Sequence, residues 1–252
     1  MTDQEPAVVI LAAGKGTRMR SDMPKVLHPV AGRPMLAYTL DLARDLGAGR
    51  VVVVVGHQAQ RVREAFSDQA GLRFVLQEPQ LGTGHAVMAA APELEDWPGP
   101  VVILCGDVPA LRPATLAALL RRQQEQDLDF TVLAMDLEDP GSYGRLLVDD
   151  DQRLLGIVEY RDADQAQRKI RLVNAGVYAA RPGPLLECLP LLRPENDQSE
   201  YYLTDMVELL NKRGYRVGYQ VCPDPREVAG INSREDLARM EEMMRELSRE
   251  RQ

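Results

Sequence analysis

The sequence predicts a Rossmann-like α/β fold, built on a mixed, mainly parallel β-sheet that is flanked by helices. Two short apolar runs, Val8–Leu11 and Val51–Val55, are rich in β-branched residues, which is typical of strands buried on both faces. Residues 33–46, between these runs, have the apolar periodicity of a helix. A strand, a helix and a second strand in this order indicate a right-handed crossover and therefore parallel pairing.

The helix at 33–46 has a predicted start and end. Pro34 suits the first helical position, and Gly47 can end the helix. Further helices are expected at residues 58–65, in a segment ending at 91, at 112–126 and at 236–252, and further strands at 72–76, 101–105, 130–135, 146–148, 154–160 and 217–221. The pair at 146–148 and 154–160 is joined by a short acidic turn and predicts an antiparallel hairpin.

The last predicted helix, residues 236–252, is highly charged but has one apolar side. That side is formed by Leu237, Met240, Met243, Met244 and Leu247. Such a stripe usually packs against the rest of a domain. We therefore expect a structural role for this helix rather than a partner-binding one.

Composition excludes several classes of protein. The chain has 252 residues and a formal net charge of -8, which argues against general nucleic-acid binding. Cys105, Cys188 and Cys222 are odd in number and widely spaced, which excludes a disulfide framework and suggests a reducing compartment. The three histidines do not have zinc-ligand spacing, and no segment reads as an export signal or a membrane span. We expect a cytoplasmic protein that binds small molecules, with neither nucleic acid nor membrane as partner.

The first loop is unusually cationic for an acidic chain. Gly14 and Gly16 follow the first strand, where they allow a sharp turn and a close approach of backbone N–H groups to a ligand. The cations Lys15, Arg18, Arg20 and Lys25 all lie within the next few residues. Backbone donors combined with Lys and Arg match the oxygens of a polyphosphate.

Two better-known phosphate loops do not fit this segment. A Walker A loop needs a Gly-Lys-Ser/Thr triplet that the chain lacks, and the dinucleotide fingerprint needs a small residue where Met19 stands. A strand-to-helix turn with solvent-facing charges is the remaining structural alternative. The cluster of cations favours a polyphosphate ligand over that alternative.

The stretch LAAGKGTRM followed by PKVL resembles the signature of sugar-1-phosphate nucleotidyltransferases. The likeness is strongest to the uridyltransferase domain of bacterial bifunctional UDP-N-acetylglucosamine pyrophosphorylase/glucosamine-1-phosphate acetyltransferases, and it continues through most of the chain. The resemblance implies a fold of the nucleotide-diphospho-sugar transferase type. It also implies that the first loop binds the nucleotide through Leu11, Ala12, Ala13, Gly14, Lys15, Gly16 and Thr17, with Arg18 and Lys25 as catalytic residues.

A second motif, Gln77 to Ala86 (QEPQLGTGHA), opens a helix. A Gln amide carries both a donor and an acceptor, so it can read the edge of a pyrimidine base. Taken alone, this stretch is more typical of a strand-to-helix turn. Because it matches the family's uracil-binding stretch, the resemblance implies that Gln77, Gln80, Gly82 and Thr83 contact the nucleotide.

The resemblance also implies a magnesium site. Asp107 follows a buried strand, where an acidic side chain can either bind Mg²⁺ or begin a turn. The family motif G-D-x-P makes Asp107 a metal ligand, and V-x-G-[IV]-N makes Asn232 the second. Ser233 and Asp236 read as a capping box, which leaves Asn232 available. Cys105 stands where family members often have an aromatic residue.

Three residues match the sugar contacts of the family: Gly144, Glu159 and Asn174. Each also has a structural explanation, as a turn glycine, a solvent-facing strand carboxylate and an Asn beside a bulge. Ala175 departs from the Ser or Thr of many relatives. The stretch EYYLTD at 200–205 matches the family as well, and we expect it to be mainly structural, with Ser199 as a helix N-cap.

The resemblance implies transfer of UMP from UTP to N-acetylglucosamine-1-phosphate with Mg²⁺ as cofactor. Residues 1–235 are expected to form one domain, with a nucleotide lobe over 1–109 and a sugar lobe over 110–232. The chain stops before hexapeptide repeats could begin, so we expect neither acetyltransferase activity nor the trimerising β-helix, and the oligomeric state stays open. Three alternatives remain: another sugar-1-phosphate or NTP, a non-catalytic nucleotide-binding module, and a nicotinamide-dependent oxidoreductase that Met19 disfavours.

Overall fold

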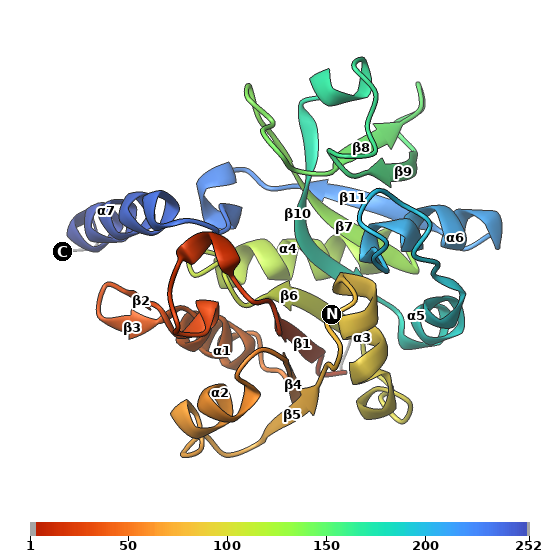
Figure 1. The fold of residues 1–252 in the computed structure, drawn as a ribbon. Coiled ribbons are helices and arrows are strands. Elements are labelled where there is room, and N and C mark those ends of the chain that lie inside the picture. The colour runs from red at the N-terminus through yellow and green to blue at the C-terminus, as the bar shows by residue number, and fades with distance from the viewer. Residues whose placement is uncertain (1–3, 251–252) are drawn as a thin grey trace.

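The computed structural model describes residues 4–250, with side chains described as far as residue 245, and its centre is one large twisted sheet (Figure 1). The main strands, in chain order, are β1 (Ala7–Ala12), β4 (Arg50–Val55), β5 (Leu72–Leu76), β6 (Val101–Cys105), β7 (Phe130–Asp136), β8 (Arg145–Val148), β9 (Leu154–Val158), β10 (Leu172–Ala180) and β11 (Val217–Val221). Their order across the sheet is β11-β7-β10-β6-β1-β4-β5, with β8 and β9 attached through β10. β10 is antiparallel to both neighbours, while β1 is parallel to β4 and β6. The predicted mixed, mainly parallel sheet is confirmed.

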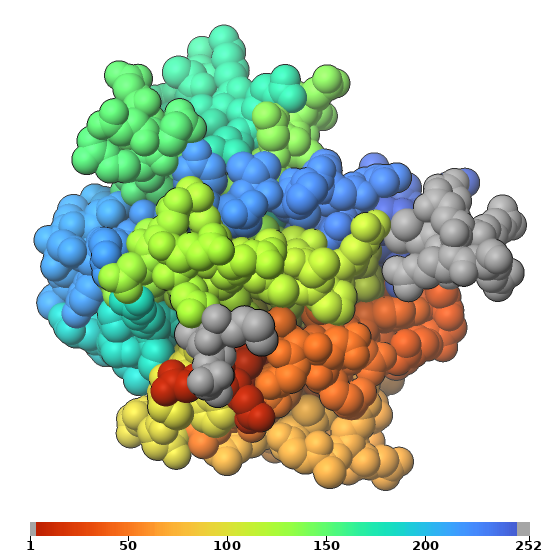
Figure 2. Space-filling model, turned by 180° about the vertical axis from the view of Figure 1, so that it is seen from behind, coloured from red at the N-terminus to blue at the C-terminus, as the bar shows by residue number. Residues whose placement is uncertain are grey.

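Helices cover both faces of this sheet. They are α1 (Met35–Asp45), α2 (Ala59–Ala65), α3 (Thr83–Ala90), α4 (Pro113–Glu125), α5 (Pro182–Cys188), α6 (Met206–Lys212) and α7 (Arg234–Glu250). One apolar cluster joins the sheet to α3, α5 and α6, and a second joins the opposite face to α1, α2 and α4. Seen from behind in Figure 2, the yellow-green region that includes α4 crosses the middle of the molecule, between the orange and the blue segments.

The central position of β1 follows from its sequence. Val8 and Ile10 belong to the cluster on one face, Val9 belongs to the cluster on the other, and all three are fully buried. A strand buried on both faces gains apolar burial from every residue, so it favours the middle of a sheet. The loop after β1 therefore emerges at the carboxyl edge of the sheet, where open α/β sheets bind their ligands.

A third apolar cluster joins the first loop to the C-terminal helix. It contains the buried residues Met19, Val30, Met35, Ala110, Ile231 and Met240. Leu237, Met243 and Met244 pack against it, which confirms that this side of α7 packs on the domain. The side chain of Leu247 lies outside the described residues. Met19, which breaks the dinucleotide fingerprint, is 1% exposed and anchors the first loop in this cluster.

The predicted start of the first helix is wrong. Arg33 and Pro34 form the short strand β3 (Arg33–Pro34), which pairs with β2 (Pro29–Val30), and α1 begins only at Met35. Ala31 and Gly32 both have positive φ, as the two central residues of a tight hairpin turn require. The predicted end is right, because Gly47 has a φ of 73° and the N–H of Ala48 reaches back to the carbonyl of Ala43 at 3.1 Å.

The predicted N-cap at Ser199 is also wrong. Ser199 has a φ of 52°, and the helical turn after it begins only at Leu203. Asn196 organises this segment instead, since its side-chain oxygen accepts from the backbone N–H groups of Gln198 and Glu200. Because no helix begins at Ser199, the residues just before Leu203 are extended and lie along the loop that contains Leu81.

The later elements agree with the sequence more closely. β8 and β9 form the expected antiparallel hairpin, and β10 has a register shift between Asn174 and Val177. One continuous sheet joins the two expected lobes, and the boundary between them stays a prediction. Among the described helices, none is both long and apolar enough to cross a membrane.

Candidate active site

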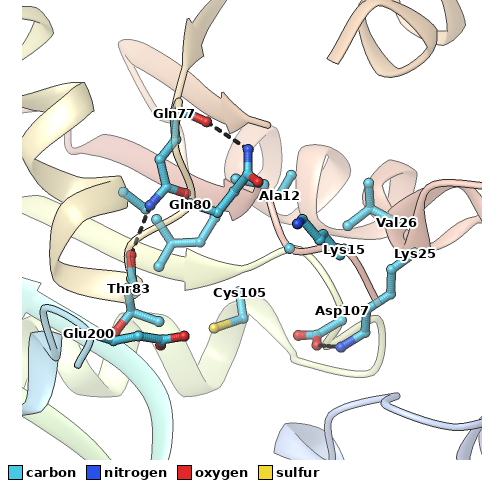
Figure 3. Close-up of a pocket in the computed structure, with 15 residues that line it drawn as sticks. Ala12, Lys15, Lys25, Val26, Gln77, Gln80, Thr83, Cys105, Asp107 and Glu200 are labelled. Carbon is cyan, nitrogen blue, oxygen red and sulfur yellow. Dashed lines mark hydrogen bonds and ion pairs between the residues drawn. The ribbon is translucent and has the colours of Figure 1, made fainter. Parts of the chain in front are cut away.

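A cavity of about 480 Å³ lies at the carboxyl ends of β1 and β6. It is lined by Leu11, Ala12, Ala13, Gly14, Lys15, Lys25, Val26, Gln77, Gln80, Gly82, Thr83, Ala86, Cys105, Asp107 and Glu200. Figure 3 shows its walls: Gln77, Gln80 and Thr83 lie at one end with Glu200 beside Thr83, Lys25 and Asp107 lie at the other end, and Cys105 lies between the two ends. Most of the residues that the sequence assigned to a nucleotide site therefore surround one hollow.

The first loop has the geometry that its glycines allow. Gly16 has φ 58° and ψ 39°, a left-handed conformation that favours glycine. A Cβ at this position would lie 2.6 Å from the Cβ of Lys25, so Gly16 also makes room for the Lys25 stem. Apart from its two chain neighbours, Gly14 has no residue within 4 Å of the place where a Cβ would stand. Its bare backbone lines the cavity, where a ligand can approach it closely.

Four residues from three distant parts of the chain meet at the edge of the cavity. Lys25 forms an ion pair with Asp107, and its Nζ also donates to Asn232 Oδ1 at 2.8 Å. Arg18 Nη2 donates to the same Asn232 oxygen at 3.0 Å. The side chains of Lys25 and Asp107 are only 13% and 19% exposed, so the pair is partly shielded from water. The cationic loop and the expected acid–amide pair thus converge on one point.

The donor set at this point suits a hard divalent cation. The Lys25 ammonium already contacts oxygens of both Asp107 and Asn232, so the two oxygens can approach a single positive charge. The backbone holds them together as well, because the N–H of Ile231 donates to the carbonyl of Asp107 at 3.0 Å. Among the described residues no cluster of three or more His, Cys, Asp or Glu side chains is arranged to hold a metal. Mg²⁺ needs no such cage, because it commonly takes one or two protein oxygens together with waters and substrate phosphates.

The opposite end of the cavity is formed by the loop between β5 and α3. Gln77 is 3% exposed, and its Nε2 donates to the carbonyl of Gly82 at 2.9 Å and lies 3.1 Å from Nδ1 of His85. Gln80 Nε2 donates to the Gln77 carbonyl at 3.0 Å. The Gln77 amide therefore shapes the loop that carries Gly82 and Thr83, whether or not it also contacts a base.

A segment that the sequence assigned a mainly structural role also reaches the cavity. The N–H of Tyr201 donates to the Leu81 carbonyl at 2.8 Å, and the N–H of Gly84 donates to the Tyr201 carbonyl at 2.7 Å. This pairing brings Glu200 into the cavity wall, a position that sequence reasoning missed. The only signal for it was that Glu200 lies within a stretch matching the family.

The three expected sugar contacts lie outside the cavity lining but next to one another. The N–H of Asn174 donates to the Gly144 carbonyl at 2.8 Å, and a Cβ on Gly144 would lie 3.3 Å from the Glu159 carboxyl group. The Asn174 side chain accepts from the N–H of Gly176 and donates to the hydroxyl of Tyr178, as a residue stabilising a bulge does. Its structural explanation is therefore sufficient by itself.

The structural explanation for Glu159 was a strand carboxylate that faces solvent, and the structure contradicts it. β9 ends at Val158, and the Glu159 carboxylate accepts from the Thr204 hydroxyl at 3.0 Å. Burial raises the pKa of Glu159 above its usual range. The nearby Asp205 has its pKa raised to about 6, first by burial and then by the charge of Glu159.

Cys105 lines the cavity and also contacts β10, the strand that carries Asn174. Its Sγ lies 3.5 Å from the carbonyl of Gly176, which follows Asn174 in β10. Burial raises the pKa of the Cys105 thiol to about 12, so the thiol stays neutral. The wall at this position is therefore uncharged.

The fold and the loop geometry define a class of protein, and comparison with known families agrees with it. The chain belongs to the family of MobA-like NTP transferase domains, whose model matches residues 8–174. It is 48% identical to the bifunctional protein GlmU of Geobacter sulfurreducens over 232 residues, which cover 92% of this chain and 49% of that protein. It is 43% identical to the bifunctional protein GlmU of Desulfotalea psychrophila over 239 residues, which cover 95% of this chain and 70% of that protein. The family resemblance carried by the first loop is confirmed.

Solved structures confirm the expected fold class. The apo structure of a UDP-glucose pyrophosphorylase superposes with a TM-score of 0.78, at 17% identity, over 97% of this chain and 99% of that one. At this identity the likeness concerns the fold alone. The chain spans about half the length of the GlmU proteins of Geobacter that it matches.

Proposed function

We propose that the protein transfers UMP from UTP to N-acetylglucosamine-1-phosphate in a Mg²⁺-dependent reaction that yields UDP-N-acetylglucosamine and pyrophosphate. The observation that carries this proposal is the meeting of Arg18, Lys25, Asp107 and Asn232 at one edge of the cavity. Two cations, a carboxylate and an amide oxygen are what a nucleoside triphosphate and its cation require. The similarity to GlmU proteins supports the choice of UTP and of N-acetylglucosamine-1-phosphate.

The reaction needs no protein base. The attacking oxygen belongs to a phosphate monoester, which is ionised near neutral pH, so catalysis consists of alignment and charge stabilisation. Asp107 and Asn232 would hold Mg²⁺, which when bound neutralises phosphate charge. Lys25 and Arg18 would donate to phosphate oxygens, with Arg18 nearer the leaving pyrophosphate, and Gly14 would let the backbone N–H groups approach the triphosphate.

The base and the sugar are assigned to opposite sides of Cys105. We place the uracil against the loop that carries Gln77, Gln80, Gly82 and Thr83, and the sugar toward Gly144, Glu159 and Asn174. This assignment follows the expected lobes over residues 1–109 and 110–232. The proposed reaction uses UTP, and the three cysteines of the protein are free. For these two reasons we place the reaction in the cytoplasm.

A second candidate is the same transfer with another sugar-1-phosphate or another nucleotide. The small, neutral Cys105 and the neighbouring Ala175 favour this possibility, since both depart from the family pattern at the wall that faces the sugar. A non-catalytic nucleotide-binding module is a third candidate. It would bind the nucleotide without releasing pyrophosphate.

A substrate panel tests the proposal. The protein is incubated with Mg²⁺, with UTP or CTP, and with N-acetylglucosamine-1-phosphate, glucose-1-phosphate or galactose-1-phosphate, and pyrophosphate release is measured. We expect the highest kcat/KM for UTP with N-acetylglucosamine-1-phosphate. Faster release with another pair would establish the second candidate, and nucleotide binding without release from any pair would establish the third.

A further inference from the structure

Arg234, the first residue of α7, reaches back to the first loop although it does not line the cavity. Its Nε donates to the carbonyl of Met19 at 3.1 Å, and its Nη2 donates to the carbonyl of Arg20 at 3.0 Å. Arg20 has a φ of 48°, so the loop turns sharply at the point that Arg234 holds. A guanidinium group suits this task, because its planar fork can bind two acceptors in fixed directions.

The same helix start fixes Asn232. The Asp236 carboxylate accepts from the N–H groups of Asn232 at 3.0 Å and Ser233 at 2.9 Å, and the Ser233 hydroxyl accepts from the N–H of Asp236 at 3.1 Å. This arrangement confirms the predicted capping box and extends it by one residue. The backbone of Asn232 is thus held relative to α7, two residues before Arg234.

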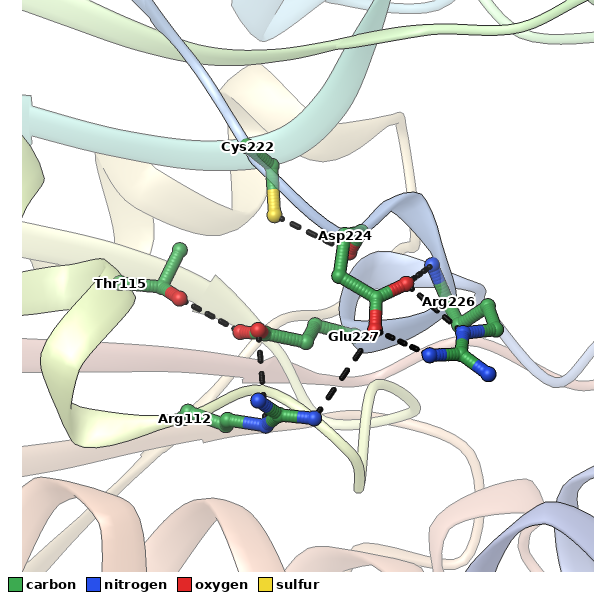
Figure 4. A network of polar contacts seen from close by, with 6 residues as sticks. All are labelled: Arg112, Thr115, Cys222, Asp224, Arg226 and Glu227. Carbon is green, nitrogen blue, oxygen red and sulfur yellow. Dashed lines mark hydrogen bonds and ion pairs between the residues drawn. The ribbon is translucent and has the colours of Figure 1, made fainter.

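The segment that leads into Asn232 is anchored on its other side as well (Figure 4). Glu227 is 6% exposed, accepts from the Thr115 hydroxyl and pairs with Arg112 at 3.5 Å, both on or beside α4. A buried carboxylate with these partners is costly to displace. Asn232 therefore lies between two anchored points of the fold, and the first loop is the part that must be positioned against it.

We propose that Arg234 is a positioning residue that sets Arg18 against Asn232. Arg18 lies in the helical turn Thr17–Met19, directly before the two carbonyls that Arg234 holds, and its Nη2 contacts Asn232 Oδ1. The buried Met19 side chain anchors the loop in the third apolar cluster. The Arg234 guanidinium group ties the carbonyls of the same loop to α7, whose first turn fixes Asn232. This inference rests on the proposed function, in which Arg18 acts on the triphosphate.

The experiment compares Arg234→Ala, Arg234→Lys and the matched control Arg245→Ala. Arg245 lies on the same helix, its side chain is 69% exposed, and it pairs with Glu241 one turn earlier. We expect Arg234→Ala to lower kcat about 10- to 100-fold with little change in the KM of the sugar phosphate, because small misplacements of a catalytic group are costly. Arg234→Lys should restore little of this loss, since an ammonium cannot bind both carbonyls in the same way. Arg245→Ala should match the wild type.

A double-mutant cycle separates positioning from general destabilisation. If Arg234 acts through Arg18, then Arg234→Ala should lower kcat by less than about 3-fold in an Arg18→Ala background, because interacting residues are not additive. An equal loss in both backgrounds, or wild-type kcat in Arg234→Ala, would overturn the inference.

Hydrogen exchange gives a readout that needs no substrate. Amide exchange over residues 17–22 should be faster in Arg234→Ala than in the wild type and in Arg245→Ala. If the wild type released no pyrophosphate with any substrate pair, the proposed function would fail, while this measurement would still test the contact. Unchanged exchange in Arg234→Ala would contradict the positioning role directly.

Discussion

Lys25→Ala and Asp107→Asn are each expected to lower kcat/KM by about 10²- to 10³-fold, which is the usual cost of removing one group that stabilises developing charge. The two side chains form one ion pair, and Lys25 also donates to Asn232. Asp107→Asn keeps the shape of the side chain and removes its charge. Both side chains line the cavity, where water can reach the partner that is left, so we expect the two variants to fold like the wild type.

Their responses to Mg²⁺ should differ. Asp107→Asn removes the negative charge of a proposed metal ligand, so higher Mg²⁺ concentrations should be needed for half-maximal activity. Lys25→Ala should not raise that requirement, because Lys25 competes with a cation for the same two oxygens. Steady-state rates over a Mg²⁺ series measure this, with the exposed Lys212→Ala as control. Wild-type turnover in both variants would remove Lys25 and Asp107 from the mechanism.

Gly16→Ala is expected to lower both stability and activity. Its φ of 58° disfavours any side chain, and the new Cβ would stand 2.6 Å from the Cβ of Lys25. Backbone strain of this kind costs about 1–3 kcal/mol. The crowded Lys25 stem must also move, which would shift Nζ away from Asp107 and Asn232. Urea denaturation measures the free energy of unfolding, and steady-state kinetics measure kcat.

Gly14→Ala is the matched control for this change. Apart from the two chain neighbours, no residue lies within 4 Å of the new Cβ, so the free energy of unfolding should stay close to that of the wild type. Gly14 lines the cavity, and we expect the KM of UTP to rise because the backbone can no longer approach the triphosphate as closely. If Gly16→Ala kept wild-type stability and kcat, the geometry described for this loop would be incorrect.

The fold was predictable because its strands are short, apolar and buried on both faces. Val8, Ile10 and the run of valines in β4 permit few other structures, and the parallel order follows from the intervening helix. Helix starts were less predictable. Pro34 is compatible with both a helix and a short hairpin, and the turn at Ala31 and Gly32 decides between them.

Contacts between distant segments account for the other differences. Ser199 has the chemistry of an N-cap, but Asn196 nearby and the pairing of Tyr201 with Leu81 and Gly84 hold the segment extended. A local pattern contains no information on such tertiary pairing. For the same reason the sequence carried little sign that Glu200 would reach the cavity.

The parts of the candidate site differed in how far the sequence alone predicted them. The prediction that the first loop binds a polyphosphate came from residue chemistry alone, because Lys15, Arg18 and Lys25 oppose the charge of the whole chain. The pairing of Asp107 with Asn232 required the family resemblance, since nothing local joins them. Arg234 carried no motif, and its contacts with the first loop became apparent only in three dimensions.

A crystal structure with Mg²⁺ and a non-hydrolysable UTP analogue would test the central claim most directly. We expect the cation to be bound by Asp107 and Asn232, with Lys25 Nζ and the Arg18 guanidinium group on phosphate oxygens of the same molecule. A triphosphate bound elsewhere, or bound in this cavity with Lys25 still paired to Asp107 and no cation between Asp107 and Asn232, would contradict the account.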